Sequence, residues 1–330
     1  MLRFLKKYWF FLGLALVLTL GILAPGVGTT LNPRSAAGTG VIVLLFIISG
    51  ITLPSESITR GLMDFKLHIF VQAFIFIFVP FSMMILTLPL RGLIDPKIIT
   101  GLYALSCLPT TISSCIVFTQ VTGGNTVGTM FNATLSNIAG VVISPLILSL
   151  VLRGSGAVII PGEIGRILGS LGLKMLLPIA AGQTARVLIP AVKRAAEEKK
   201  GTFRVASNSL ILLIIFFSIS KAAGTPDFRS TLTKMGLPFL FLAGFHLYLL
   251  AAAYIGGRIF RFRKDSLKSV VFTAPQKTVA LGVPLISAYF ADSPEILGVA
   301  LLPVVFYHSF QLVAAGSIKS LPFLAYREDE

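Results

Sequence analysis

Hydrophobic residues fill long, nearly uninterrupted stretches of this chain, and short segments between them carry most of the charge. Several stretches reach about 20 residues, the length that an α-helix needs to cross the hydrocarbon core of a bilayer. The pattern predicts an all-α, polytopic membrane protein with ten transmembrane helices, because a β-barrel would show short alternating strands instead. The predicted spans cover residues 8–25, 36–53, 67–89, 97–121, 124–152, 169–192, 205–222, 235–260, 267–290 and 295–318.

The composition agrees with a membrane protein, since 55% of the residues are hydrophobic, 12% are charged and the mean hydropathy is +0.89. A soluble domain carries about 25% charged residues. In a soluble protein the net charge of +15 would indicate a nucleic-acid partner, but here the cations lie mostly between the spans. We therefore expect the lipid bilayer as a partner and no nucleic acid.

Lysines and arginines also predict the orientation. If the N-terminus is cytoplasmic, the cytoplasmic segments hold about twice as many of these residues as the opposite side. We expect a multi-pass protein of the cell inner (plasma) membrane with both termini cytoplasmic. Arg186 falls within the sixth span, and we expect its side chain to snorkel to the nearby interface.

The ten spans divide into two sets of five within one transporter unit, residues 1–330. Residues 1–153 hold the first set and residues 160–322 the second. An odd number of spans places the two halves in opposite orientations, so a shared fold would make a 5+5 inverted repeat, as in many secondary transporters. The fourth and ninth spans each contain a proline followed by polar residues, at 108–114 and 274–280.

These prolines predict broken helices that cross. Proline removes a backbone donor, and an unpaired backbone group in lipid costs several kcal/mol unless protein, water or ligand satisfies it. Helix ends that meet at a break can bind ions or substrate, although threonines here could also bond only their own helix. The candidate binding residues around the breaks are Pro109, Thr110, Thr111, Ser113, Ser114, Thr273, Pro275, Gln276, Lys277 and Thr278.

Polar residues elsewhere in the spans are further candidates. Asn132 in the fifth span and His308 in the tenth occupy matching positions in the two halves. His308 and Gln311 lie one helical turn apart and therefore share a face. Two more positions are possible ligands: Gln72 and His246.

Lys277 is the most unusual of these residues. A lysine at the bilayer centre costs roughly 2.5–3.5 kcal/mol and usually marks an ion or substrate path. All thirteen acidic residues fall in loops, span ends or tails, so we expect no carboxylate in the membrane interior. We expect Lys277 to act as a built-in cation.

The breaks also carry a resemblance. Leu108-Pro109 precedes small polar residues up to Ser114, followed by Gly124-Asn125 and Ser144-Pro145-Leu146. In these stretches the chain resembles the bile acid:sodium symporter family, and the resemblance covers nearly the whole length. It is most similar to the branch that includes the orphan seventh member of the vertebrate bile acid carrier group. The resemblance implies a panel domain of spans 1, 2, 6 and 7, and a core domain of spans 3–5 and 8–10.

The chain departs from that family at the sodium site. A typical member has an acidic sodium ligand at the ninth-helix break, where this chain reads Thr273-Ala274-Pro275-Gln276-Lys277. The Ser-Asn pair of the fourth helix is Ser114-Cys115 here, and the hydroxyls of the fifth span are kept at Thr129 but lost at Ala133. The resemblance therefore leaves a sodium site of Ser114, Thr129 and Thr273 at most. Lys277 could stand in the place of sodium or exchange a proton, so the coupling ion stays open between Na+ and H+, and no cofactor is expected.

The resemblance implies an organic anion as the substrate, so the predicted function is secondary active transport of a small organic anion by alternating access. One alternative is a cation/proton antiporter-like protein, although such antiporters generally need an intramembrane aspartate. Another is a membrane regulator of ion homeostasis that does not transport. We expect no enzyme, because the sequence lacks the Gly-x-Ser-x-Gly and His-Glu-x-x-His arrangements. Substrate identity, direction and oligomeric state stay open.

Overall fold

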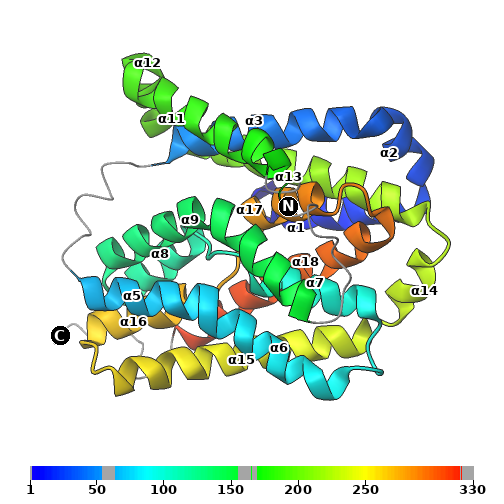
Figure 1. The fold of residues 1–330 in the computed structure, drawn as a ribbon. Coiled ribbons are helices and arrows are strands. Elements are labelled where there is room, and N and C mark those ends of the chain that lie inside the picture. The colour runs from blue at the N-terminus through cyan, green and yellow to red at the C-terminus, as the bar shows by residue number, and fades with distance from the viewer. Residues whose placement is uncertain (1, 54–63, 155–164, 166–168, 320, 322–330) are drawn as a thin grey trace. The chain divides into compact units, whose positions relative to one another are not determined.

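The computed structural model describes residues 2–53, 64–154, 165, 169–319 and 321, without the side chains of residues 2–8. Every named element within these ranges is a helix (Figure 1). This confirms the all-helical prediction. The chain folds into two compact units, which are described separately below.

Within the described residues, six helices are long and apolar enough to cross a membrane, and the number rises to eight if each of two bent pairs forms one span. The bent pairs are Trp9–Leu23 with Pro25–Leu31, at 98°, and Gly169–Leu188 with Pro190–Glu198, at 102°. The predicted fourth and ninth spans are each divided into two shorter helices. None of these helices is long enough to be counted as a membrane-crossing helix. Ten spans and the inverted repeat therefore remain predictions.

The first unit comprises Met1–Leu53, Ile160–Thr233 and Val283–Leu301. Within it α3 lies along α11, and α13 packs against both α1 and α3. Its helices are α1 (Leu2–Leu23), α2 (Pro25–Leu31), η1 (Pro33–Ser35), α3 (Ala36–Thr52), η4 (Gly172–Leu176), α11 (Leu177–Leu188), α12 (Pro190–Glu198), α13 (Lys200–Ala223) and α14 (Phe228–Thr233).

Two glycines bring α3 and α11 together. A Cβ on Gly50 would collide with the carbonyl oxygen of Ile179, and a Cβ on Gly182 would collide with that of Ile47. The contact is reciprocal, so each glycine faces the backbone of the other helix. Small residues allow such close approach between membrane helices, where dispersion rather than the hydrophobic effect drives association.

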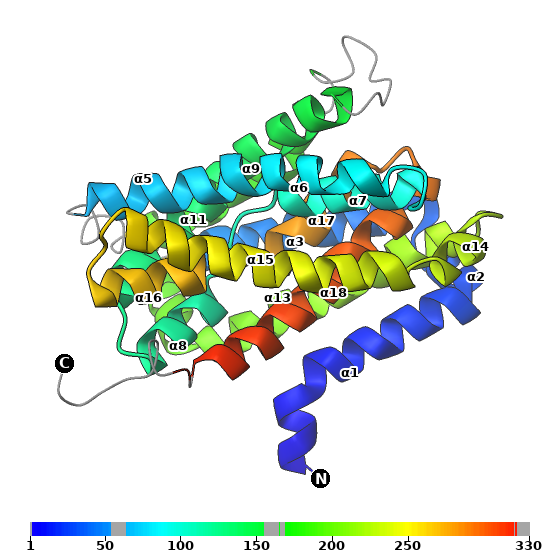
Figure 2. The ribbon, with the colours of Figure 1, turned by 90° about the horizontal axis from the view of Figure 1, so that it is seen from below.

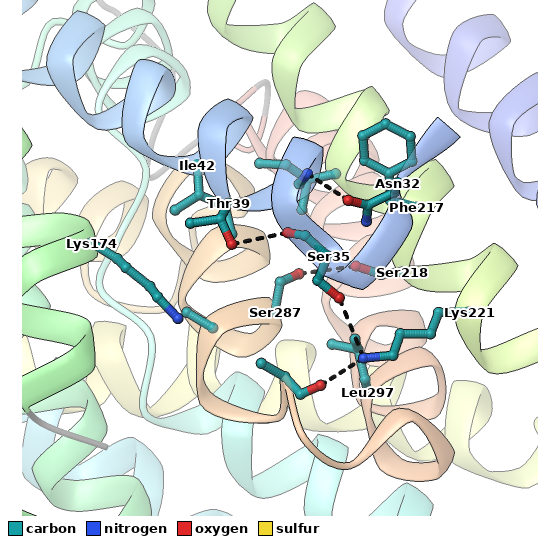
Figure 3. A pocket seen from close by; sticks show the side chains of 14 residues that line it. Asn32, Ser35, Thr39, Ile42, Lys174, Phe217, Ser218, Lys221, Ser287 and Leu297 are labelled. Atoms are coloured by element: carbon teal, nitrogen blue, oxygen red, sulfur yellow. Dashed lines mark hydrogen bonds between the residues drawn. The ribbon is translucent and has the colours of Figure 1, made fainter. Parts of the chain in front are cut away.

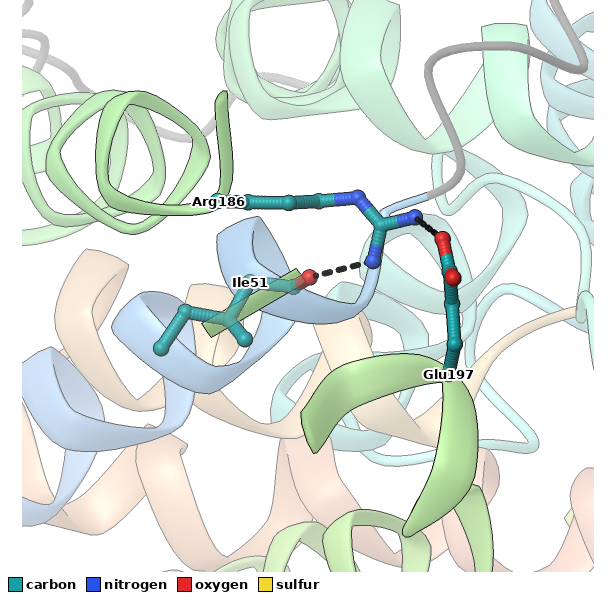
Figure 4. Close-up of polar contacts among 3 residues, drawn as sticks. All are labelled: Ile51, Arg186 and Glu197. Atoms are coloured by element: carbon teal, nitrogen blue, oxygen red, sulfur yellow. Dashed lines mark hydrogen bonds and ion pairs between the residues drawn. The ribbon is translucent and has the colours of Figure 1, made fainter. Parts of the chain in front are cut away.

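Arg186 of α11 is held by partners of the first unit, and its position relative to the membrane interface stays a prediction. Its side chain is 5% exposed, and its two terminal nitrogens donate to the Ile51 carbonyl, at 3.2 Å, and to the Glu197 carboxylate, at 3.1 Å (Figure 4). The reason is the sharp turn before Pro190, because a residue preceding proline favours extended backbone and Ile189 has φ −113° and ψ 101°. The turn swings α12 back and places Glu197 within reach, whereas the predicted span continued straight to residue 192.

The second unit comprises Pro54–Ile159, Lys234–Gly282 and Leu302–Glu330. In it α15 and α16 lie side by side, and α16 also packs against α8 and α9 (Figure 2). Its helices are α5 (Phe65–Ala73), η2 (Phe74–Phe78), α6 (Val79–Thr87), η3 (Leu88–Leu90), α7 (Pro96–Ser106), α8 (Ser113–Val121), α9 (Thr126–Gly154), α15 (Gly236–Ile259) and α16 (Lys264–Thr273). Two further helices contribute to both units: α17 (Val279–Tyr289) and α18 (Pro294–Ile318).

A single π-helical turn, η2, interrupts the long third span. Here the Val79 N–H bonds back to the carbonyl of Phe74, five residues earlier. The next carbonyl, that of Ile75, would need the N–H of Pro80 to continue this pattern, and proline has none. The bulge therefore frees the Ile75 carbonyl for another partner, as π-bulges at functional sites often do.

Candidate substrate and ion site

The predicted breaks in the fourth and ninth spans are present. Helix α7 ends at Ser106 and α8 begins at Ser113, while α16 ends at Thr273 and α17 begins at Val279. Pro109 and Pro275 lie within the two breaks, where their rings and missing N–H groups oppose continued helix.

The two breaks also meet within the second unit. The Thr278 N–H donates to the Pro109 carbonyl at 2.9 Å, and the Thr110 hydroxyl donates to the Thr273 carbonyl at 2.6 Å. Asn137 of α9 donates its amide to the Thr110 carbonyl at 2.7 Å. Backbone groups freed by one break are thus satisfied by the other, which removes the cost of leaving them unpaired in lipid.

Lys277 lies at this meeting point and is 1% exposed. Its ammonium nitrogen, Nζ, donates to three backbone carbonyls, those of Leu108 at 2.7 Å, Ser106 at 2.8 Å and Ile75 at 3.3 Å. An ammonium has three hydrogens to donate, so the three carbonyls use its full capacity. Two of these carbonyls belong to the carboxyl end of α7 and the residues after it, where the helix dipole favours a positive charge.

The surroundings of this ammonium resemble those of a bound alkali cation. Among the described residues no carboxylate is bonded to Lys277, and its side-chain nitrogen is bonded to backbone carbonyls instead. Rings of carbonyl oxygens also replace the hydration shell of potassium in channel filters. The lysine therefore places its side-chain nitrogen where three carbonyl oxygens converge.

Gln311 fixes the peptide groups on either side of Lys277. Its Oε1 accepts from the Lys277 N–H at 2.8 Å, and its Nε2 donates to the Lys277 carbonyl at 2.8 Å. The same Nε2 lies 3.0 Å from Nδ1 of His308, which must accept this hydrogen bond. The two predicted residues of α18 thus hold the backbone of the ninth-span break.

Tyr307 supports the same break, although the sequence pattern did not single it out. Its hydroxyl donates to the Pro275 carbonyl at 2.7 Å and lies 2.9 Å from Nδ1 of His246. Because the hydroxyl hydrogen is used by Pro275, Nδ1 of His246 must carry the hydrogen of the second bond. The predicted residue His246 therefore contacts the site only through Tyr307. The position of Tyr307 next to His308 in the sequence could have indicated its role.

Polar side chains around Gln276 form a second group. Its Oε1 accepts from the Thr111 hydroxyl at 2.7 Å and from the Ser114 hydroxyl at 2.8 Å, so it bridges the two breaks. Ser113, predicted with them, is exposed and lies outside this group of bonded side chains.

The three candidate sodium ligands fall into different groups. Ser114 belongs with Gln276, whereas the Thr129 hydroxyl lies 2.6 Å from that of Ser269, 3.1 Å from Thr119 and 3.4 Å from Thr273. The hydroxyl-bearing residues Thr119, Thr129, Ser269 and Thr273 are fully buried, and the hydroxyls of the other three bond to that of Thr129. Neutral hydroxyls without a carboxylate make a weak donor set for a cation, so a sodium site stays a prediction. Sequence reasoning missed Thr119 and Ser269, which a polar stripe in α8 and α16 could have indicated.

Gln72 and Asn132 bond to each other rather than to Lys277. Nε2 of Gln72 donates to the Asn132 carbonyl at 3.1 Å and to its Oδ1 at 3.2 Å, while the Asn132 amide donates to the Gly128 carbonyl at 2.9 Å. Oε1 of Gln72 is buried without a hydrogen-bond partner in the described structure. This pair therefore retains one free acceptor.

Comparison with known proteins identifies the family. The sequence pattern of the SBF-like CPA transporter family matches residues 8–321. The chain belongs to this family. It is 29% identical over 324 residues to sodium/bile acid cotransporter 7-B of Xenopus laevis, covering 96% of this chain and 92% of the relative.

Two microbial relatives extend the family relationship. The uncharacterized protein PA2026 of Pseudomonas aeruginosa is 30% identical over 278 residues, covering 83% of this chain and 80% of its own. The solute carrier RCH1 of Saccharomyces cerevisiae is 24% identical over 377 residues, covering 97% and 84%. The predicted resemblance to bile acid:sodium symporters is confirmed, and this family member is a multi-pass membrane protein of a transport family.

Proposed function

We propose that the protein is a secondary active transporter that moves a small organic anion by alternating access, with Lys277 in the place of the coupling cation. The observation that carries the proposal is the ammonium of Lys277, held by three carbonyl oxygens where the two broken helices meet. The name of the Xenopus laevis relative refers to sodium and bile acid, and this name describes that protein alone.

Electrostatics favours this role for the lysine. An unpaired charge in a medium of low dielectric constant is costly, and an anion that enters such a region needs a nearby positive charge. In a sodium-coupled carrier the ion supplies that charge, whereas here it is attached to the chain. The anion would then need no co-bound sodium, which agrees with the absence of a carboxylate around Lys277 among the described residues.

The broken helices suit alternating access. Half-helix ends and unwound backbone near the membrane midplane form the binding sites of many transporters. Both breaks are built into the second unit together with α9, α15 and the part of α18 from Leu302 onward. The proposal also includes a panel domain and a core domain, an inverted repeat and two cytoplasmic termini.

Proton coupling is the second candidate. A lysine that releases its proton during the cycle would link anion movement to proton movement, and the matched family is described as one of CPA transporters. A non-transporting regulator would show neither sodium-dependent nor proton-dependent flux.

Uptake into proteoliposomes tests the proposal. The wild type, Lys277→Met and the exposed control Lys234→Met are compared with taurocholate and succinate as probes, in sodium-free potassium buffer and then in sodium buffer. We expect anion uptake without sodium, at least tenfold slower in Lys277→Met and unchanged in Lys234→Met. Uptake that requires sodium and is unchanged in Lys277→Met would overturn the role of Lys277. If uptake stops when a protonophore removes the pH gradient, the result would support proton coupling.

A further inference from the structure

A polar hollow in the first unit is separate from the Lys277 site. A cavity of about 50 Å3 shares much of its lining with a larger cavity of about 480 Å3. Residues of η1, α3, η4 and α13 line it, together with Asn32, residues of α17, the segment after α17 and Leu297 at the start of α18 (Figure 3). Every lining residue belongs to the first unit.

The hollow is lined by an excess of positive charge. Lys174 and Lys221 line both cavities, and Arg34 lines the larger one. Among the described residues, Asp292 is the single acidic residue that lines the larger cavity, and the smaller cavity is lined by none. Figure 3 shows the two lysines reaching into the hollow from different helices. Such a surface attracts an anion, and its partial burial strengthens that attraction above the value in water.

Hydrogen-bond donors remain available there. Lys221 donates to the Ala291 carbonyl at 2.8 Å and lies 3.5 Å from the Ser35 hydroxyl, which fixes its ammonium beside the cavity. Lys174 lines both cavities, and its ammonium forms no hydrogen bond or ion pair with the part of the chain that the structure describes. Asn32 uses its Oδ1 to accept from the Gly38 N–H at 2.8 Å, which leaves its amide hydrogens available.

Two irregular stretches of backbone shape the hollow. Arg34 and Ser35 are consecutive non-glycine residues in the left-handed region, with φ of 49° and 60°. Such strain persists where the surrounding structure requires it and is frequent at ligand sites. Lys174 lies in the π-helical turn η4, and Pro178 removes the N–H that the Leu173 carbonyl would use, so this turn cannot continue as a π-helix.

We propose that this hollow binds a small oxyanion, a carboxylate, sulfate or phosphate group, between Lys174 and Lys221. The ammonium groups provide charge, and the Asn32 amide and Ser35 hydroxyl provide orientation. The oxyanion can belong to a free solute or to the phosphate of a lipid headgroup, since both offer the same chemistry. The site requires no contribution from Lys277.

Binding to detergent-purified, delipidated protein tests this site. Potassium sulfate, phosphate and succinate are titrated against potassium chloride at equal ionic strength, with calorimetry and thermal denaturation as readouts. A second arm compares micelles containing phosphatidic acid with micelles containing phosphatidylcholine. The variants are Lys174→Gln and Lys221→Gln, with the exposed Lys200→Gln as the matched control. Lys221→Arg keeps the charge and therefore shows whether an effect of Lys221→Gln comes from the lost charge.

We expect saturable binding in at least one arm, weakened tenfold or more by Lys174→Gln and by Lys221→Gln, kept by Lys221→Arg, and unchanged by Lys200→Gln. The responding arm identifies the source of the oxyanion. An absence of saturable binding in both arms, or equal affinity in Lys174→Gln and wild type, would overturn the site. Lys277→Met should bind the oxyanion with wild-type affinity, so a failure of the transport proposal is distinguishable from a failure of this one.

Discussion

Removal of the Lys277 side chain should convert the carbonyl cluster into a site for free cations. In Lys277→Ala the carbonyls of Ile75, Ser106 and Leu108 lose their donor, although their positions are still set by η2 and by the end of α7. The cluster then presents three oxygens to a space left by a lysine side chain. A small monovalent cation in that space would restore the lost interactions.

The magnitude follows from two opposing contributions. A buried acceptor without a donor costs about 1–3 kcal/mol, so three carbonyls together cost roughly 3–9 kcal/mol. Removing a lysine from the membrane interior returns roughly 2.5–3.5 kcal/mol. At the middle of both ranges the lost hydrogen bonds to the three carbonyls outweigh this gain, and we expect a net destabilisation of about 3 kcal/mol, together with a midpoint of thermal denaturation several degrees lower.

Thermal denaturation of detergent-purified Lys277→Ala measures both effects. Sodium, potassium and methylammonium chloride should raise the midpoint of the variant in a saturable manner and leave the wild type unaffected, whereas the bulky choline ion should not act. Lys234→Ala serves as the exposed control. A variant as stable as the wild type, or one whose midpoint is indifferent to small cations because water fills the space, would refute the interpretation of the cluster as a cation site.

Other contacts allow shorter tests. Gln311→Leu should lower the free energy of unfolding by about 1–3 kcal/mol, because the peptide groups beside Lys277 lose both partners; an unchanged denaturation midpoint would contradict this. Tyr307→Phe should cost about 0.5–1.5 kcal/mol and slow anion uptake, and wild-type uptake would show that the ninth-span break needs no such support. Gly182→Ala should destabilise the first unit because its methyl group meets the backbone of α3, whereas Gly244→Ala, which has open space, should be neutral or stabilising. Equal midpoints for these two variants would argue against the tight α3–α11 contact.

Several features of the site could be read from the chain. Pro109 and Pro275 predicted helix breaks because the lack of an N–H acts locally in any fold. Gln311 and His308 were selected together because helical spacing puts residues three apart on one face, and the structure places both at the break. The partners of Lys277 could not be found in this way, since they are backbone carbonyls, and every residue has one.

Arg186 shows the same limit in the first unit. Its place near the end of a span suggested a side chain in the interface, yet the turn before Pro190 returns Glu197 to it and buries the arginine. The predicted span ran through Pro190 to residue 192, whereas the structure turns before this proline, and the direction of the turn depends on packing around α11 and α12. Thr129 was likewise chosen from sequence, whereas its neighbours Thr119 and Ser269 emerged only from three helices brought together.

By itself the sequence determined that this chain is a helical membrane protein, that two of its spans break at prolines, and that a lysine lies at one break without a nearby acidic residue in the chain. These properties follow from hydropathy, from missing backbone donors and from charge, which act locally. The tertiary structure decided which break meets which, and so converted an isolated lysine into an ammonium bound by three carbonyls. The reason is that a buried charge is stabilised by the directions of dipoles around it, and those directions exist only after the helices have packed.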